Sequence, residues 1–195
     1  MGRRSDHSRA ELTEMALKAA REIIRKDGVS ALSTRRLARQ IGYTSGMLYQ
    51  IFRNRDDLVE QVNIGTLAML YDHCRTDPRD LSVQIRLRRL ADDFVSFATA
   101  HPNEWDAVIN YPFSPDHQTS QVAHNQTDQL LALLCDAISE LYEPEQADRK
   151  QRDVRLLWNC LYGIFALASA GRLTQDRSHG AAVDDLIDLY LAART

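Results

Sequence analysis

The apolar residues of this chain recur every three or four positions over almost its whole length, and no stretch alternates between apolar and polar residues. This spacing places apolar side chains on one face of a helix, whereas a half-buried strand requires alternation. Residues 12–24 show the spacing most clearly, with one continuous stripe of Leu12, Met15, Ala16, Ala19, Ala20, Ile23 and Ile24. The sequence therefore predicts an all-α fold of about nine helices.

Residues that favour helix ends divide this pattern into segments. Ser8 and Glu11 have the spacing of a capping box, and Gly28 is placed to end the first helix. Gly42 predicts a tight turn between two short helices, because glycine tolerates a positive φ angle. Thr44 is expected to cap the second short helix with its hydroxyl group.

The later helices are predicted to be longer. We expect them over about residues 55–74, from about residue 80 to 101, from 144 to 171 or 172, and near the C-terminal end. Ser114 followed by proline predicts one more helix start, because proline suits the first helical position.

Charge is distributed unevenly along the chain. The formal net charge is -3, yet residues 1–58 contain 12 Lys and Arg against 7 Asp and Glu. A basic first third suits a polyanion such as DNA, and the acidic remainder would avoid it. A chance asymmetry is the alternative, so charge alone does not decide the function.

Other features of composition favour a cytoplasmic protein. The three cysteines, Cys74, Cys135 and Cys160, are widely spaced and form no Cys-x-x-Cys pair, so we expect buried thiols rather than disulfides or a zinc site. No signal peptide is visible, and no apolar run reaches the length of a membrane span. We expect no membrane contact.

Residues 33–52 predict a helix, a glycine turn and a second short helix. Leu37, Ala38 and Ile41 can pack against Leu48 and Phe52, which are four residues apart. The other side chains of the second short helix would then face outward, where a DNA major groove can receive them. A glutamine there can bond adenine through both polar atoms of its amide group. The alternative is a structural helical hairpin with a polar surface.

This segment resembles the tetracycline-repressor (TetR) family of bacterial regulators. That family has a recognition helix of the form Ser/Thr-x-Gly-x-Leu-Tyr-x-x-Phe, matched by Thr44-Ser45-Gly46-Met47-Leu48-Tyr49-Gln50-Ile51-Phe52. Leu37-Ala38 with Ile41-Gly42-Tyr43 matches the helix before it, and Asn54-Arg55-Asp56-Asp57-Leu58 matches the segment after it. Tyr43 stands where valine is commoner, and Arg55 replaces the usual lysine.

The resemblance implies an N-terminal three-helix helix-turn-helix domain that binds double-stranded DNA, over residues 1–55. It also implies a helical domain for ligand sensing and dimerisation, over residues 56–195. Carried over by position, the phosphate-contacting residues are Thr34, Arg35, Thr44, Tyr49 and Arg55. The base-facing residues are Tyr43, Ser45, Met47 and Gln50, and Gly46 permits a close approach of the backbone. Arg3 and Arg4 form either a minor-groove arm or an unstructured basic tail.

The C-terminal half is similar to one TetR subgroup, which is named for a Trp-His-Gly signature in its sensor domain. Residues 97–105 and 158–163 carry this similarity, although Tyr162 replaces the histidine. Large amphipathic rings suit an apolar ligand site, and plain core packing is the alternative. The candidate ligand-binding residues are Phe94, His101, Trp105, Ile109, Leu134, Trp158 and Tyr162, with Tyr111 and Phe113 as further candidates.

Two further expectations concern metals and assembly. His101, His117 and His124 are interpreted as solvated histidines rather than metal ligands, and no cofactor is expected. The last two long helices have apolar stripes wide enough for a homodimeric four-helix bundle. These stripes contain Leu157, Leu161, Ala168, Leu186, Ile187, Tyr190 and Leu191, beside the small residues Gly163, Ala166 and Ala170.

Together these features predict a ligand-responsive transcriptional regulator, a repressor that a small molecule releases from a palindromic operator. One alternative is a TetR-like regulator that answers to a protein partner or to no ligand. A helical ligand carrier or an enzyme is a more remote alternative, since no catalytic motif is present in the sequence.

Overall fold

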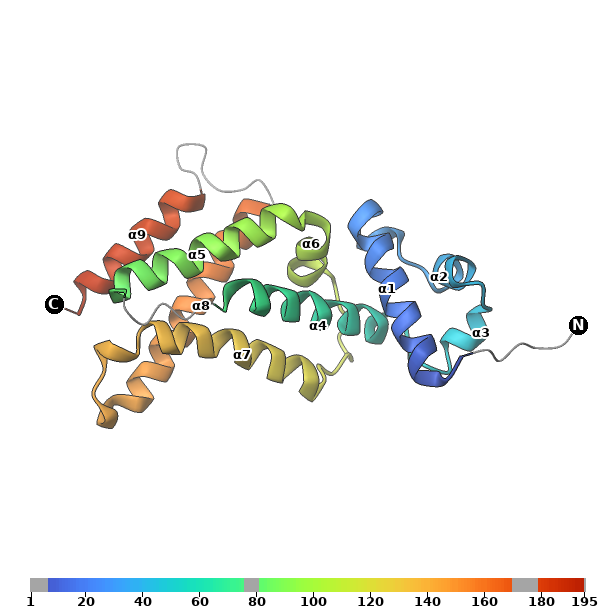
Figure 1. Ribbon diagram of the computed structural model, residues 1–195, viewed down its shortest axis with the longest axis horizontal. Helices are drawn as coiled ribbons and strands as arrows, with labels where there is room; N and C mark the ends of the chain where they lie inside the picture. Colours follow the sequence, from blue (N-terminus) through green and yellow to red (C-terminus); the bar gives the residue numbers. More distant parts are fainter. Residues whose placement is uncertain (1–6, 76–80, 170–178, 195) are drawn as a thin grey trace, which may run out of the picture. The chain divides into compact units, whose positions relative to one another are not determined.

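The computed structural model describes residues 7–75, 81–169 and 179–194, and all of its regular elements in these ranges are helical (Figure 1). The predicted all-α fold is therefore confirmed. Three short 3-10 helices span Val29–Ala31, Ser139–Leu141 and Pro144–Gln146. The nine α-helices of the described ranges are α1 (Arg9–Asp27), α2 (Thr34–Ile41), α3 (Ser45–Leu48), α4 (Arg55–Cys74), α5 (Val83–Ala100), α6 (Pro102–Asn110), α7 (Gln121–Ala137), α8 (Ala147–Ser169) and α9 (His179–Ala192).

The chain forms two compact units. The first consists of residues up to Thr66 together with His101–Ala123, and the second of Leu67–Ala100 together with residues from His124 onward. The single helix α4 thus contributes its first part to one unit and its last part to the other. These units do not follow the predicted functional division at residues 55 and 56, because the first turns of α4 pack into the core of the N-terminal helices. That division stays a prediction about function.

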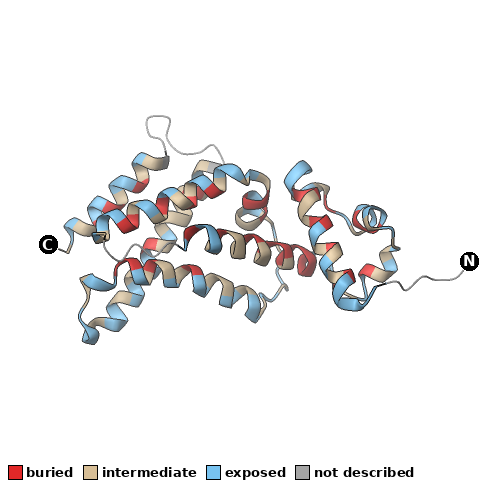
Figure 2. Ribbon diagram, in the orientation of Figure 1, coloured by how far each residue is buried: buried red, intermediate tan, exposed pale blue. Residues whose placement is uncertain are grey.

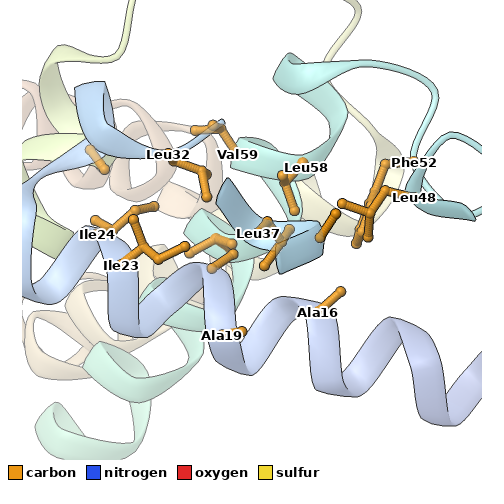
Figure 3. Packing of buried hydrophobic residues seen from close by; sticks show 14 residues of the cluster. Ala16, Ala19, Ile23, Ile24, Leu32, Leu37, Leu48, Phe52, Leu58 and Val59 are labelled. Carbon is orange, nitrogen blue, oxygen red and sulfur yellow. The ribbon is translucent and has the colours of Figure 1, made fainter. Parts of the chain in front are cut away.

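The core of the first unit lies between α1, α2 and α4. Figure 3 shows Ile23 and Ile24 of α1 facing the side chain of Leu37, with Leu58 and Val59 of α4 beside them. All five are at most 2% exposed, and six of the seven residues of the predicted stripe on the first helix are buried, while Met15 is half-buried. Figure 2 shows such buried positions recurring along α1. Close packing of this kind makes the unit sensitive to the loss of single methyl groups.

The ends of the first helices follow the predicted local rules. The Ser8 amide donates to Glu11 Oε2 at 2.7 Å, and the Glu11 amide donates to Ser8 Oγ at 3.3 Å, which completes the capping box. Gly28 follows α1 with φ 78°, and Gly42 follows α2 in the left-handed region with φ 77°. Residues with a Cβ atom are strained in that region, so glycine determines the turn between α2 and α3.

Two predicted helix starts differ from the structure. Thr44 occupies the N-cap position of α3, but its hydroxyl makes no capping hydrogen bond. No helix starts after Ser114, and α7 begins only at Gln121. Instead, the hydroxyl and the amide of Ser114 donate to Asp56 Oδ2, at 2.6 and 3.1 Å, and hold this residue in the loop. A partner 58 residues away therefore overrides the local signal.

The second unit consists of α5, α7, α8, α9 and the end of α4. Helix α5 packs along α9, where Arg88 forms ion pairs with Asp184 at 3.2 Å and Asp188 at 2.9 Å. Arg86 is buried beside the end of α7 and donates to the Ala137 carbonyl and to Glu140. The predicted end of the long helix at residue 171 or 172 lies outside the described residues. No helix in the described ranges is long and apolar enough to span a membrane.

Replacing Gly42 with alanine should destabilise the first unit by about 1 to 2 kcal/mol, because alanine pays that strain in the left-handed conformation. Urea unfolding followed by circular dichroism measures the change. Gly46→Ala is the matched control, since a Cβ there would meet only Thr44 Oγ1 at an ordinary 3.9 Å. Equal stability losses in the two variants would contradict the assigned backbone conformation.

Candidate nucleic-acid interface

The short helix α3 and the turn after it have one buried and one exposed face. Leu48 and Phe52 are buried in the core of the first unit. The Phe52 amide donates to the Leu48 carbonyl at 2.8 Å, so helical geometry continues past the end of α3. Tyr49 lies between these anchors in the sequence and is 59% exposed, and Gln50 is exposed beside it. The two apolar anchors thus fix which side chains point to solvent.

None of the ten predicted DNA-contacting residues is buried. Helix α2 begins after Ser33, whose hydroxyl accepts a hydrogen bond from the Arg36 amide at 3.2 Å. The same helix exposes three arginines, Arg35, Arg36 and Arg39. Of the predicted residues, those exposed are Arg35, Thr44, Gly46, Tyr49, Gln50 and Arg55, and those half-buried are Thr34, Tyr43, Ser45 and Met47.

Two of the predicted DNA-contacting side chains also hold contacts within the protein. The Tyr43 hydroxyl lies 2.7 Å from His7 Nδ1, and their rings meet edge to face. Arg55 donates to the Val29 carbonyl at 2.9 Å, and its guanidinium lies 5.6 Å from the centre of the Tyr111 ring. Sequence reasoning missed His7, because it precedes the first helix and belongs to none of the matched motifs.

Asp56 ties the start of α4 to the loop after α6. Its carboxylate accepts hydrogen bonds from the Tyr111 hydroxyl at 2.6 Å, the Ser114 hydroxyl at 2.6 Å and the Ser114 amide at 3.1 Å. The Ser114 and Tyr111 hydroxyls hold the pKa of Asp56 below its ordinary value, against the opposing effect of burial. Burial and the bond to Asp56 raise the pKa of Tyr111 to about 12.

A second buried carboxylate, Glu60, lies one helical turn further along α4. It accepts a hydrogen bond from the Ser120 amide at 2.9 Å, and His117 Nε2 lies 3.4 Å from it. The His117 ring also stacks on Phe113 at 4.6 Å between centroids. His117 is therefore half-buried rather than solvated, which corrects the prediction for this residue. No group of three metal-ligating side chains occurs within the described ranges.

The second unit contains an apolar pocket with a cavity volume of about 30 Å³. It includes three of the seven predicted ligand-binding residues, namely Phe94, Leu134 and Trp158. Cys74, the last residue of α4, also lines the pocket. The other lining residues are Leu87, Leu90 and Ala91 of α5, Leu130 and Leu133 of α7, Leu157 and Leu161 of α8, and Leu186 and Ile187 of α9.

The other four predicted ligand-binding residues lie elsewhere. Tyr162 is half-buried on α8, one turn after Trp158, with 6.4 Å between the ring centroids. His101, Trp105 and Ile109 belong to the first unit. Trp105 is 2% exposed there, and His101 Nδ1 lies 3.7 Å from the buried Glu104. The structure therefore does not bring these residues into the pocket beside Trp158.

The apolar surfaces of α8 and α9 differ from the predicted dimer stripes. Leu157 and Ile187 are buried in the second unit and line the pocket, and Tyr190 is buried with its hydroxyl 2.7 Å from the Tyr142 hydroxyl. The exposed leucines are their neighbours on other faces: Leu156 is 58%, Leu167 49% and Leu189 71% exposed. Leu191, Leu161 and Ala168 are half-buried, and Ala170 lies outside the described residues, as do Arg3 and Arg4.

The amino-acid sequence matches two family models. Residues 16–62 match bacterial regulatory proteins of the tetR family, and residues 87–190 match a tetracyclin repressor-like C-terminal domain. The second match alone covers more than half of the chain. Among curated proteins, none matches this sequence.

Solved structures share the fold at low sequence identity. A TetR transcriptional regulator from Rhodococcus sp. RHA1 has a TM-score of 0.72 and 16% identity, with 94% of this chain and 98% of that chain covered. A protein of unknown function from the same organism has a TM-score of 0.70 and 21% identity, with 98% of both chains covered. A tetR-family transcriptional regulator from Streptomyces coelicolor has a TM-score of 0.68 and 18% identity, with 94% of this chain and 80% of that chain covered.

Asp56→Asn should lower the free energy of unfolding by about 2 kcal/mol near neutral pH, because hydrogen bonds to a charged acceptor are lost. Since the folded-state pKa lies below the unfolded value of about 3.9, the contribution is present above about pH 4 and fades as the pH falls through the folded-state pKa. Denaturant unfolding at several pH values measures it. Asp116→Asn, an exposed carboxylate in the same loop, should change stability by less than about 0.5 kcal/mol. A difference between wild type and Asp56→Asn that does not shrink in acid would contradict this assignment.

Proposed function

The chain belongs to the TetR family of DNA-binding transcriptional regulators, and from this premise we propose that it is a repressor released from a palindromic operator by a small molecule. The observation that carries the proposal is the outward orientation of Tyr49 and Gln50 on a helix anchored by Leu48 and Phe52. A major groove admits such a helix, and exposed polar side chains on it can read base edges.

The proposed contacts fall into two kinds. Arg35, Thr34, Thr44, Tyr49 and Arg55 would bind phosphates, which positions the protein without choosing a sequence. The exposed arginines of α2 support this assignment, because each arginine side chain that approaches the DNA phosphates releases a counterion bound to the DNA. Tyr43, Ser45, Met47 and Gln50 would face the bases and choose the sequence. The unengaged Thr44 hydroxyl is free of a capping bond and so suits a phosphate oxygen.

We assign homodimerisation to the exposed faces of α8 and α9. Leu156, Gly163 and Leu167 are seven and four residues apart, so they share one face of α8. A Cβ atom added at Gly163 would meet nothing within 4 Å, which leaves this face open to a second helix. Leu189 supplies an apolar side chain on α9. A two-fold dimer built on these faces would read half-sites about 34–36 Å apart, or a multiple of that distance.

Helix α4 is the element through which a ligand would act. Cys74, its last residue, lines the pocket, while Arg55 begins the helix in the proposed DNA-binding part. A ligand that moves the Cys74 end would move this helix and change the separation of the two recognition helices in a dimer. Such coupling is typically worth about 1–3 kcal/mol, and ligand and DNA must weaken each other's binding equally.

A second candidate is a regulator that answers to a protein partner instead of a small molecule. The observation that favours it is the small cavity, since about 30 Å³ accommodates only one or two water molecules. Operator affinity would then be independent of any ligand that enters the pocket. The two candidates therefore differ in a single measurement: operator affinity with the pocket occupied and empty.

Duplexes selected from a random pool by the purified protein should contain an inverted repeat. On the selected duplex, Gln50→Ala should weaken binding by about 1–3 kcal/mol and relax the preference at one position of each half-site. Arg35→Ala should weaken selected and unrelated duplexes alike and reduce the salt slope by about one for each subunit. Fluorescence anisotropy at several salt concentrations measures both effects.

Arg89→Ala is the matched control for Arg35→Ala, because Arg89 is an exposed arginine on α5 outside the proposed interface. It should leave the salt slope unchanged. If the protein selects no sequence and the two arginine variants change the salt slope equally, the proposed interface is excluded.

Leu189→Glu should convert the dimer to a monomer, because a carboxylate would be buried without a partner in an apolar interface. Analytical ultracentrifugation should show the mass falling by half while the circular dichroism stays helical. Val122→Glu is the control, since Val122 is 60% exposed on α7, outside the proposed dimer faces. A dimer that survives Leu189→Glu would place the interface elsewhere.

A further inference from the structure

Within the described part of the chain, no charged side chain lines the pocket of the second unit. Eight of its thirteen lining residues are leucines, and the others are Ala91, Phe94, Ile187, Trp158 and Cys74. An anionic ligand group placed there would lose its water and gain no counter-charge, which is unfavourable even when the rest of the ligand fits. The lining therefore disfavours an anionic ligand, whatever the shape of that ligand.

Among the described lining residues, the titratable group is the Cys74 thiol, and it remains neutral at physiological pH. Burial raises the pKa of Cys74 to about 12, and the nearby Asp93 carboxylate adds to this effect. A carboxylate close enough to disfavour the thiolate also disfavours any other anion at that end of the pocket. Cys74 can offer a ligand only a weak neutral hydrogen-bond donor.

Two aromatic residues, Phe94 and Trp158, line the pocket. Phe94 stacks on Phe165 with 4.3 Å between centroids, and it meets Trp158 edge to face at 6.2 Å. Such rings favour flat or apolar partners. The rest of the lining is mostly leucine, whose side chains can change rotamer when a ligand enters a cavity of about 30 Å³.

From this chemistry we infer that the effector is a predominantly apolar molecule, aromatic or aliphatic, without a carboxylate or sulfonate group. The inference rests on the proposed function, because it names the ligand class for the same pocket. It predicts that a neutral compound binds more tightly than an anionic compound of nearly the same shape.

The test compares two fluorescent probes with one apolar skeleton. N-phenyl-1-naphthylamine is neutral, and 8-anilino-1-naphthalenesulfonate adds a sulfonate to it. Titration of the full chain should give at least about ten-fold tighter binding of the neutral probe, a ratio equivalent to about 1.4 kcal/mol. The bound neutral probe should be displaced by neopentylbenzene, which is also apolar and uncharged.

Substitutions in α7 test whether the neutral probe binds in the pocket. Leu133 of α7 is half-buried in the lining, so Leu133→Phe should weaken binding of the neutral probe about five-fold or more and Leu133→Ala should not weaken it. Val122→Ala, on the same helix but outside the pocket, should leave the affinity unchanged. Thermal unfolding of each variant checks that the chain remains folded.

Each outcome decides the inference. Equal or tighter binding of the sulfonate, or no binding of the neutral probe, overturns it. Insensitivity of the neutral probe to Leu133→Phe also overturns it, because the probe then binds elsewhere. Operator affinity is measured separately in the same samples. A neutral probe that occupies the pocket without changing operator affinity leaves the ligand class standing and rejects regulation through this pocket.

Discussion

The burial of Leu48 and Phe52 is the interaction on which the proposed interface depends. These side chains enter the cluster formed by α1, α2 and α4, and burial of each contributes about 1.5–3 kcal/mol. Helix α3 has only four residues, too few to be stable through its own hydrogen bonds. Its orientation is therefore set by tertiary packing, and the exposure of Tyr49 and Gln50 follows from what their neighbours bury.

Most of the fold could be predicted because its signals are local. The stripe on α1, the Ser8–Glu11 capping box and the glycine turn at Gly42 depend on residues within a few positions of one another. The start predicted at Ser114 was wrong because its hydroxyl binds Asp56, and no local rule includes a residue so distant in the sequence. The family resemblance was confirmed, whereas the Trp-His-Gly subgroup stays a prediction.

The pocket and the dimer surface were harder to predict from the sequence. A leucine that lines a cavity and a leucine that fills a core have the same periodicity, so Leu87 or Leu161 carried no distinguishing signal. Aromatic residues were not better markers, because Phe94 and Trp158 line the pocket whereas Trp105 lies in the core of the first unit. On α8, adjacent residues Leu156 and Leu157 face solvent and core respectively, a difference that depends on the helix's rotation.

The hydrogen bonds of Asp56 have an evolutionary consequence. One carboxylate holds both Tyr111 and Ser114, which lie 55 and 58 positions further along the chain. A lineage that loses the acid leaves two hydroxyl groups without their acceptor, and a lineage that loses a hydroxyl group weakens the hold on the acid. Substitutions at the three positions should therefore be correlated among descendants of this sequence, as a case of epistasis between a helix start and a remote loop.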